Sequence, residues 1–319
     1  MDVPIVYYNG RFLPEPETRV PILTHALQYG TGVFEGIRAY HDVSTGEVLL
    51  FRGKDHFERM QQNVKFLNIK LPLPPADLAE VALELIRRNC LSADVYIRPV
   101  AFKSTTKVGV MLSPEDSFAM VAVAMGPYLD THKGLHCGVS SWRRLQDNSI
   151  PCRAKICGAY VNSALAAQEA RDRGFDEAIF LNEAGHVAEG SAMNLFLVRA
   201  GSLVTPDVSQ GILEGITRDT AMTLARDEMG IPTEARAVDR TELYVAQEVF
   251  LCGTAAQIAP VTRVDGRLVG SGKPGPVTLQ LQKIYDRVVR GGMPKYNHWV
   301  QPVFGLVDTA LRSWEDSIR

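Results

Sequence analysis

The chain contains little that would mark it for a membrane, a nucleic acid or an oxidising compartment. No window in its 319 residues reaches the roughly 18 apolar residues of a membrane-spanning helix, and the N-terminus has no basic region followed by an apolar one. The formal net charge of −2 gives no basic footprint for nucleic acid. The five cysteines form no CxxC pair and no zinc-type double pair. We therefore expect a cytosolic protein with reduced thiols, no metal site and small-molecule ligands.

Lysine is scarce in the middle of the chain. Lys155 is the only lysine between residues 134 and 272, a stretch that contains twelve arginines. An ammonium group can lose its proton when desolvated and attack a carbonyl, whereas a guanidinium stays protonated. Lys155 is therefore a candidate Schiff-base lysine, and the alternative is an ordinary surface lysine. Cys152 and Cys157 flank it, and a packing role is favoured over a redox role for both.

A dinucleotide-binding signature is also missing. No Gly-x-Gly-x-x-Gly opens a helix, and strands do not alternate regularly with helices, which disfavours a dinucleotide-binding fold. Asn9-Gly10 predicts a hairpin over residues 4–13. Apolar spacing and strand-like runs then predict helices at 57–67 and 78–86 and strands at 95–102 and 118–125. The first part of the chain is expected to be an α+β module.

Residues 127–134 indicate a domain boundary. This stretch is polar, lacks apolar periodicity and is bounded by glycine and proline, which is typical of an interdomain connection. We predict a small α+β domain at 1–126 and a larger domain at 135–319. The larger domain is predicted to contain strands at 135–142, 176–182 and 193–199 and helices near 158–173, 216–229 and 276–290.

A lysine imine becomes a catalyst when it holds pyridoxal phosphate, and that cofactor needs an anion cradle. Residues 215–219, Gly-Ile-Thr-Arg-Asp, begin a predicted helix whose unpaired amides can bind phosphate, with Gly215 allowing close approach and Thr217 adding a hydroxyl. The alternative is an ordinary helix start capped by Thr217. A weaker second cradle is Gly253-Thr254-Ala255-Ala256, where Thr254 can donate to phosphate and the Thr254 and Ala255 amides can face a substrate carboxylate.

Two further patterns supply charged groups. Glu189, in Ala-Glu-Gly-Ser-Ala-Met-Asn, is a candidate for keeping the pyridine nitrogen protonated, although an isolated glutamate is more often a solvated loop charge. Tyr96 and Arg98 are two residues apart on a predicted strand, so their side chains share one face and suit carboxylate recognition. The alternative is an edge strand with an outward salt bridge, which Pro99 makes credible.

Taken together, these motifs resemble the branched-chain-amino-acid aminotransferases in the class IV (fold type IV) group of pyridoxal-phosphate enzymes. The resemblance covers about residues 5–290 in the family's order. Its motifs are Tyr29-Gly-Thr-Gly-Val-Phe34-Glu-Gly-Ile-Arg38, Tyr96-Ile-Arg98-Pro, Ser140-Ser-Trp142-Arg, Ala154-Lys155-x-x-Gly158-x-Tyr160, Glu189-Gly-Ser-Ala, Gly215-Ile-Thr-Arg-Asp219 and Gly253-Thr-Ala-Ala256. It implies an α+β fold with a small N-terminal α/β sandwich domain and a larger C-terminal pseudo-barrel domain.

The resemblance also implies a role for each site residue. Lys155 forms the imine with the cofactor and shuttles the substrate proton. The expected cofactor contacts are Tyr160 to the ring phenolate, Glu189 to the pyridine nitrogen, Leu213 to the ring, and Arg59, Gly215, Ile216, Thr217 and Thr254 to the phosphate. The substrate α-carboxylate is expected to contact Tyr96, Thr254 and Ala255, and the side-chain carboxylate of glutamate to contact Arg98. The expected pocket wall consists of Tyr29, Phe34, Gly36, Val110 and Tyr128, and part of it comes from a neighbouring subunit.

The implied reaction moves the amino group of leucine, isoleucine or valine to 2-oxoglutarate in two half-reactions, within at least a homodimer. Two positions depart from the family pattern: Met193 replaces a glutamate and Ala159 an asparagine, which puts substrate range and cofactor affinity in doubt. The alternatives are a D-amino-acid or (R)-amine transaminase, a chorismate-derived lyase, or a non-catalytic protein that binds pyridoxal phosphate. Tyr96-Ile-Arg98-Pro favours the L-branched-chain interpretation, because it supplies the arginine that glutamate needs.

Overall fold

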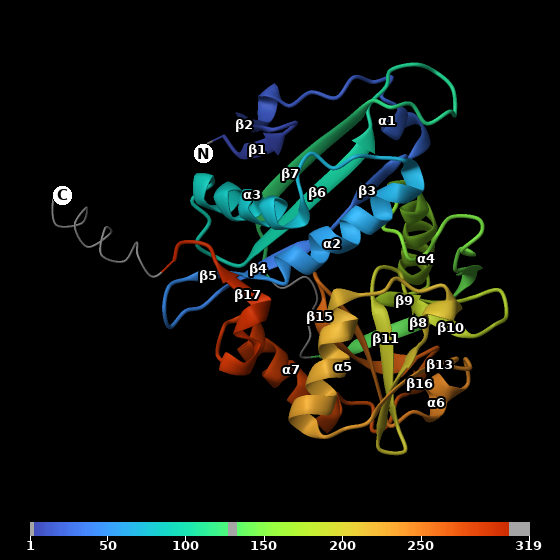
Figure 1. Ribbon diagram of the computed structural model, residues 1–319. Helices are drawn as coiled ribbons and strands as arrows, with labels where there is room; N and C mark the ends of the chain where they lie inside the picture. Colours follow the sequence, from blue (N-terminus) through green and yellow to red (C-terminus); the bar gives the residue numbers. More distant parts are fainter. Residues whose placement is uncertain (1–2, 127–132, 306–319) are drawn as a thin grey trace.

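The computed structural model describes residues 3–126 and 133–305, which fold around two β-sheets (Figure 1). Among these residues the first sheet has eight strands in the order β17-β5-β4-β6-β7-β1-β2, with β3 paired to β6, and every pairing in it is antiparallel. Its strands are β1 (Ile5–Tyr8), β2 (Arg11–Pro14), β3 (Gly32–Phe34), β4 (Ile37–His41), β5 (Val48–Phe51), β6 (Val95–Lys103), β7 (Asp116–Ala124) and β17 (Val300–Pro302).

Two amphipathic helices cover this first sheet (Figure 1). They are α2 (Gly53–Asn63) and α3 (Pro75–Arg88). The periodic apolar residues that predict them are buried in one cluster with the strands or packed against it. The helix predicted over 57–67 is confirmed with one difference: its last turn is the 3-10 helix η2 (Val64–Leu67), which ends at Asn68 in a left-handed conformation with φ 49°. The smaller elements here are η1 (Glu15–Glu17) and α1 (His25–Tyr29).

The predicted hairpin at the start of the chain is confirmed. Strands β1 and β2 pair with Tyr8 opposite Arg11, so the loop is the dipeptide Asn9-Gly10. Both loop residues have positive φ, 45° for Asn9 and 88° for Gly10. Such a turn matches the right-handed twist of the flanking strands, and few residue pairs other than Asn-Gly adopt it easily.

The second sheet has nine strands among the described residues, in the order β10-β9-β8-β15-β14-β11-β12-β13, with β16 paired to β15. Its strands are β8 (Leu135–Arg143), β9 (Glu177–Leu181), β10 (Val187–Gly190), β11 (Asn194–Arg199), β12 (Ser202–Pro206), β13 (Thr233–Arg236), β14 (Glu248–Gly253), β15 (Gln257–Val264) and β16 (Arg267–Leu268). Its helices are η3 (Cys157–Ala159), α4 (Tyr160–Asp172), η4 (Val208–Gln210), α5 (Ile216–Met229), α6 (Glu242–Val245), α7 (Pro276–Val289) and η5 (Pro294–Trp299).

The two faces of the second sheet are both apolar but pack differently. Along β11, Phe196 and Val198 join the core under α5 and α7, whereas Leu195 and Leu197 belong to a cluster drawn mainly from other strands. Successive side chains of a strand point to opposite faces, so this second face packs largely on itself, as in a barrel. The α+β class and the barrel-like second sheet agree with the sequence prediction.

The change from one sheet to the other falls across residues 127–134, because β7 ends at Ala124 and β8 begins at Leu135. The division of the chain into two domains at this stretch stays a prediction. One segment departs from it: residues 300–302 form β17, which pairs with β5 of the first sheet although the prediction places them in the second domain (Figure 1). A three-residue strand carries no periodic signal, so only the fold reveals its partner.

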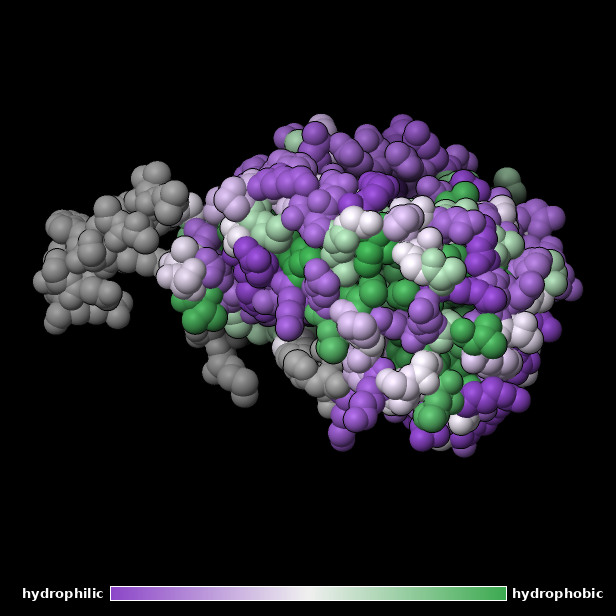
Figure 2. Space-filling view, turned by 90° about the horizontal axis from the view of Figure 1, so that it is seen from below, coloured by the Kyte–Doolittle hydropathy of each residue, from purple (hydrophilic) through white to green (hydrophobic). Residues whose placement is uncertain are grey.

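The surface combines hydrophilic and hydrophobic residues. Seen from below, green hydrophobic residues form groups separated by purple hydrophilic ones (Figure 2). Within residues 3–126 and 133–305, no helix is long and apolar enough to cross a membrane.

Candidate active site

A cavity of about 320 Å³ is lined by residues of both sheets. From the first sheet, the lining residues include Phe34 at the end of β3 and Gly36 in the β3–β4 connection. Tyr96 and Arg98 line the cavity from β6. The second sheet and its helices contribute the rest, including Lys155. A site built between two sheets depends on contacts far apart in sequence, which the local patterns do not determine.

Lys155 lies between β8 and η3, on the wall of this cavity. Its neighbours Ala154 and Ile156 are buried in the core of the first sheet, and its carbonyl oxygen accepts a hydrogen bond from the Phe34 amide at 3.1 Å. Its Nζ donates to the hydroxyl of Tyr160, the first residue of α4, at 2.5 Å. Lys155 therefore has a fixed backbone and an amine that lines the cavity, so the alternative of an ordinary surface lysine is wrong.

Glu189 lies in β10 and is only 4% exposed, so it is not a solvated loop charge. Its Oε1 pairs with Arg144 at 2.7 Å, and its Oε2 accepts from Asn194 Nδ2 at 2.9 Å and from the Leu213 amide at 3.1 Å. Burial raises the pKa of Glu189, and the positive charge of Arg144 opposes that rise. Because these neighbours are all donors, they suit an ionised carboxylate.

The N-terminus of α5 opens into the cavity without a side-chain cap. Gly215 is the N-cap, so Thr217 is a residue of the first turn and the alternative that it caps the helix is wrong. A Cβ at position 215 would collide with Asn194 Oδ1, which explains the glycine. Arg59 of α2 donates from Nη1 to the Glu214 carbonyl at 2.8 Å, directly before this helix. Uncapped amides beside a guanidinium form an anion-binding site.

A carboxylate-binding group occupies another part of the cavity. Arg98 donates to the Tyr96 hydroxyl from Nη2 at 2.5 Å, which confirms that the two side chains share a face of β6. The Arg98 guanidinium also lies 4.4 Å from the centre of the Phe34 ring. A Cβ on Gly36 would collide with the Tyr96 hydroxyl, so a glycine is required there.

Strand β6 is not an edge strand, so the alternative of an outward salt bridge there is wrong. It pairs with β3 and β4 on one side and with β7 on the other. Pro99 fits inside the sheet because it lies opposite the break between β3 and β4, where its carbonyl still accepts the Glu35 amide at 3.0 Å. Proline has no amide hydrogen to donate, and at this break the sheet offers no acceptor for one, so no ladder hydrogen bond is lost.

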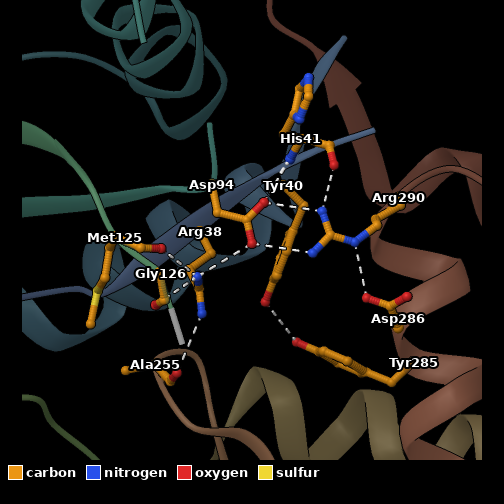
Figure 3. Close-up of polar contacts among 10 residues, drawn as sticks. All are labelled: Arg38, Tyr40, His41, Asp94, Met125, Gly126, Ala255, Tyr285, Asp286 and Arg290. Atoms are coloured by element: carbon orange, nitrogen blue, oxygen red, sulfur yellow. Dashed lines mark hydrogen bonds and ion pairs between the residues drawn. The ribbon is translucent and has the colours of Figure 1, made fainter. Parts of the chain in front are cut away.

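The turn Gly253–Ala256, which leads from the end of β14 to the start of β15, also lines the cavity. Arg38, which pairs with Tyr96 across the β4–β6 ladder, is 1% exposed. It donates to the carbonyl of Met125 at 2.7 Å and approaches that of Ala255 at 3.4 Å (Figure 3). One buried cation thus connects the first sheet, the residues that directly follow β7 and the turn.

The same polar network extends to the C-terminal helix α7 (Figure 3). Arg290, just after α7, pairs with Asp94 at 3.0 Å, and Asp94 lies 3.5 Å from Arg38. The hydroxyls of Tyr40, from β4, and Tyr285, from α7, lie 3.3 Å apart. These contacts hold α7 against the first sheet.

Most of the site residues expected from the sequence meet in this cavity. They are Phe34, Gly36, Arg59, Tyr96, Arg98, Lys155, Tyr160, Glu189, Leu213, Gly215, Ile216, Thr217, Thr254 and Ala255. Tyr29 and Val110 do not line it: Tyr29 is 40% exposed and its hydroxyl accepts from the Gly109 amide at 3.2 Å, and Val110 is 76% exposed. Tyr128 lies outside the described residues. The departures Met193 and Ala159 both line the cavity.

The sequence patterns do not assign a role to Glu35, Arg144 or Asn194, which hold the site residues in place. Each lies inside or directly beside one of the quoted motifs, and that position is the only signal in the sequence that marks them. No group of three or more His, Cys, Asp or Glu side chains is arranged to hold a metal ion in the part of the chain that the structure describes.

Comparisons with known proteins identify the same family. The family described as amino-transferase class IV matches residues 32–264. A probable branched-chain-amino-acid aminotransferase of Aquifex aeolicus (strain VF5) is 44% identical over 299 residues, which cover 93% of this chain and 96% of that protein.

Two solved structures share the fold. The branched-chain aminotransferase of the archaeon Thermoproteus uzoniensis with norvaline has a TM-score of 0.90 at 41% identity, covering 95% of this chain and 100% of that one. The branched-chain amino acid aminotransferase of Thermobaculum terrenum in its PLP-form has a TM-score of 0.90 at 38% identity, covering 94% of this chain and 98% of that one. These similarities confirm the resemblance inferred from the motifs and the fold type IV architecture.

Proposed function

Because the chain belongs to the class IV aminotransferases, we propose that it transfers the amino group of leucine, isoleucine and valine to 2-oxoglutarate. The observation that carries the proposal is the meeting of Lys155, Glu189 and Arg98 in one cavity. A panel of L-amino acids, D-amino acids and (R)-amines, each paired with 2-oxoglutarate, tests it. We expect turnover with the branched-chain L-amino acids, and a preference for D-amino acids or (R)-amines would favour the alternative transaminases of this fold.

The cofactor is pyridoxal 5'-phosphate, and the cavity fits its functional groups. Arg59 and the uncapped start of α5 at Ile216 and Thr217 match a phosphate, and Glu189 matches a protonated ring nitrogen. The remaining contacts in the proposal are Tyr160 to the ring oxygen, Leu213 to the ring face and Thr254 to the phosphate. When bound, the cofactor supplies an electron-withdrawing ring that stabilises negative charge at the substrate α-carbon.

The protein's own groups move the proton. Lys155 Nζ is the amine in the cavity that would take a proton from the substrate α-carbon and deliver it to the carbon on the other side of the imine nitrogen, in the cofactor. The Tyr160 hydroxyl accepts a hydrogen bond from this amine, which orients it. The centre of the apolar Phe34 ring lies 5.0 Å from Lys155 Nζ, so this ring shields the amine on one side. These contacts hold the amine at the wall of the cavity, where the proposal places the substrate.

Two separate groups bind the carboxylates of the substrates. In the proposal, the Tyr96 hydroxyl and the amides of Thr254 and Ala255 bind the α-carboxylate that all substrates share. Arg98 binds the second carboxylate, which only glutamate and 2-oxoglutarate carry. Its stacking on Phe34 places this cation beside an apolar wall, so one pocket can accept both a leucine side chain and a carboxylate.

We expect Arg98→Met to discriminate between the two substrate types. It removes a charge-assisted bidentate pair worth roughly 1.5–3 kcal/mol, or about ten- to over a hundredfold in binding, from dicarboxylates alone. The KM for 2-oxoglutarate should rise by this factor, while that for leucine or 4-methyl-2-oxopentanoate changes little. Steady-state kinetics of both half-reactions measure the effect. Equal losses for both substrate types would instead indicate that Arg98 supports the structure around Tyr96.

We expect Arg144→Met to make the reaction dependent on pH. The Arg144 charge lowers the pKa of Glu189, so its loss raises that pKa further above the ordinary value. A larger fraction of Glu189 is then protonated at a given pH, and the neutral acid stabilises a protonated ring nitrogen less than the carboxylate does. The rate should fall by roughly tenfold or more at neutral pH and recover as the pH is raised.

The pH profile of kcat, compared with that of the exposed neighbour variant Arg143→Met, measures this change. A profile of Arg144→Met parallel to the wild type would contradict the proposed influence of Arg144 on Glu189.

The proposal includes at least a homodimer in the cytosol. Val108, Val110 and Met111 are 81%, 76% and 83% exposed, and hydrophobic groups of this kind are usually buried by a partner. Tyr29 and Val110 would then complete the partner's pocket. The mass in solution at micromolar concentration tests the assembly, and a fully active monomer would contradict it.

A further inference from the structure

A buried carboxylate lies behind Arg59. Glu35, in the connection between β3 and β4, is 0% exposed. Its Oε1 accepts from Arg59 Nε at 2.8 Å, and its Oε2 accepts from Arg59 Nη2 at 2.7 Å and bonds His56 Nδ1 at 2.9 Å. Both partners come from α2. A planar guanidinium held by two parallel bonds has one orientation, because both bonds lie in its plane.

The other nitrogen of Arg59 reaches the second sheet. Nη1 donates to the Glu214 carbonyl, which directly precedes the N-cap of α5. The bonds to Glu35 and Glu214 use three of the five N–H donors of the guanidinium among the described residues. Two donors therefore remain for a ligand in the cavity that Arg59 lines with Ile216 and Thr217.

Glu35 is ionised in this setting. Burial raises its pKa, but the charge of Arg59 and the hydrogen bonds of His56 and Arg59 bring the pKa well below the ordinary value. A negative charge near a phosphate site weakens phosphate binding by repulsion, whereas a fixed guanidinium strengthens it. The two effects have opposite signs, so removing the charge of Glu35 reveals which one dominates.

We propose that Glu35 is a positioning residue for phosphate recognition, which holds Arg59 so that its free donors and the first amides of α5 converge on one phosphate group. The inference rests on the proposed function, because the phosphate is that of pyridoxal 5'-phosphate. Phe34 and Gly36, on either side of Glu35, line the cavity. One short connection therefore contributes to the substrate pocket and supports the phosphate site behind it.

Equilibrium binding of pyridoxal 5'-phosphate and of pyridoxal, which lacks the phosphate, to the full-length protein freed of cofactor tests the proposal. In Glu35→Gln the preference for the phosphorylated form should fall by about tenfold or more, since a charge-assisted pair no longer orients Arg59. Pyridoxal affinity should stay within about twofold of the wild type. The matched control is Glu58→Gln, which makes the same charge change on α2 at a side chain that is 49% exposed and 3.7 Å from Lys54.

An unchanged preference in Glu35→Gln, or tighter binding of the phosphorylated cofactor, would overturn the inference. If Glu35→Gln fails to fold, the phosphate preference of Arg59→Met is compared with that of the double variant Glu35→Gln/Arg59→Met. The double variant leaves no unpaired charge of this ion pair buried, because both charges are removed together. If the two variants have equal preference for the phosphorylated form, Glu35 acts through Arg59. If the double variant has a lower preference than Arg59→Met, Glu35 acts by another route and the inference is contradicted. A wild type that binds both cofactor forms equally would refute the proposed function itself.

Discussion

Lys155→Ala is expected to abolish transamination and the visible absorbance of a lysine-bound cofactor. The loss should be at least on the order of 10³-fold, because in the proposed function the same amine forms the bond to the cofactor and transfers the proton. Among the described residues that line the cavity, Lys155 is the only lysine, so no neighbour can replace it. Single-turnover assays with leucine, together with absorbance spectra of the reconstituted protein, measure both effects.

Lys155→Arg separates the charge from the chemistry. A guanidinium keeps a positive charge near the rings of Phe34 and Tyr160, but it does not lose its proton. We expect this variant to be as inactive as Lys155→Ala. Both should unfold at nearly the wild-type temperature, since the backbone here is anchored by the buried side chains of Ala154 and Ile156. Near wild-type turnover in either variant would show that another group provides the amine.

Elements with a strong local signal could be predicted from the sequence. The Asn9-Gly10 turn requires two positive φ angles and so determines where its hairpin turns. Helix α3 has apolar residues at helical spacing, a proline at its first position and arginines in its last turn, each of which favours a helix there. These features depend on neighbours within a few residues, which is the range over which a sequence pattern can be interpreted.

The contacts that hold the site together have no such local signal. Arg59 reaches Glu35 across 24 residues and the Glu214 carbonyl across 155. Any buried arginine needs an acceptor, but the sequence does not say which one, since that depends on how the two sheets pack. The motifs identify residues such as Glu189 that line the cavity, and only the fold identifies its partner Arg144.

Glycines at the site illustrate the same difference. The sequence predicts that Gly215 allows close approach to a phosphate. The structure gives a reason of its own: a side chain there would collide with Asn194, which itself bonds Glu189. Gly36 is similarly required by the hydroxyl of Tyr96. A glycine pattern therefore predicts that space is needed, whereas the neighbour that needs the space appears only in three dimensions.

Glu189→Gln is expected to leave the cofactor bound but to lower the rate constant by on the order of a hundredfold or more. The phosphate contacts proposed for Arg59, Ile216 and Thr217 do not involve Glu189, so affinity should be largely retained. The rate falls because a neutral amide stabilises a protonated ring nitrogen far less than a carboxylate does. Glu183→Gln, an exposed position on the adjoining turn, makes the same charge change and serves as the control.

The hydrogen-bond donors around Glu189 also allow a prediction for the pH dependence of the rate in Glu189→Gln. Arg144, Asn194 and the Leu213 amide all donate to the carboxylate, so the NH2 group of a glutamine meets a donor at either oxygen position. Unlike Arg144→Met, Glu189→Gln has no ionisable group left at this position, so raising the pH should not restore its rate. Single-turnover rates across pH with full cofactor occupancy distinguish the two variants. An unchanged rate constant in Glu189→Gln would mean that another acidic group protonates the ring, whereas recovery at high pH would mean that Arg144 acts independently of Glu189.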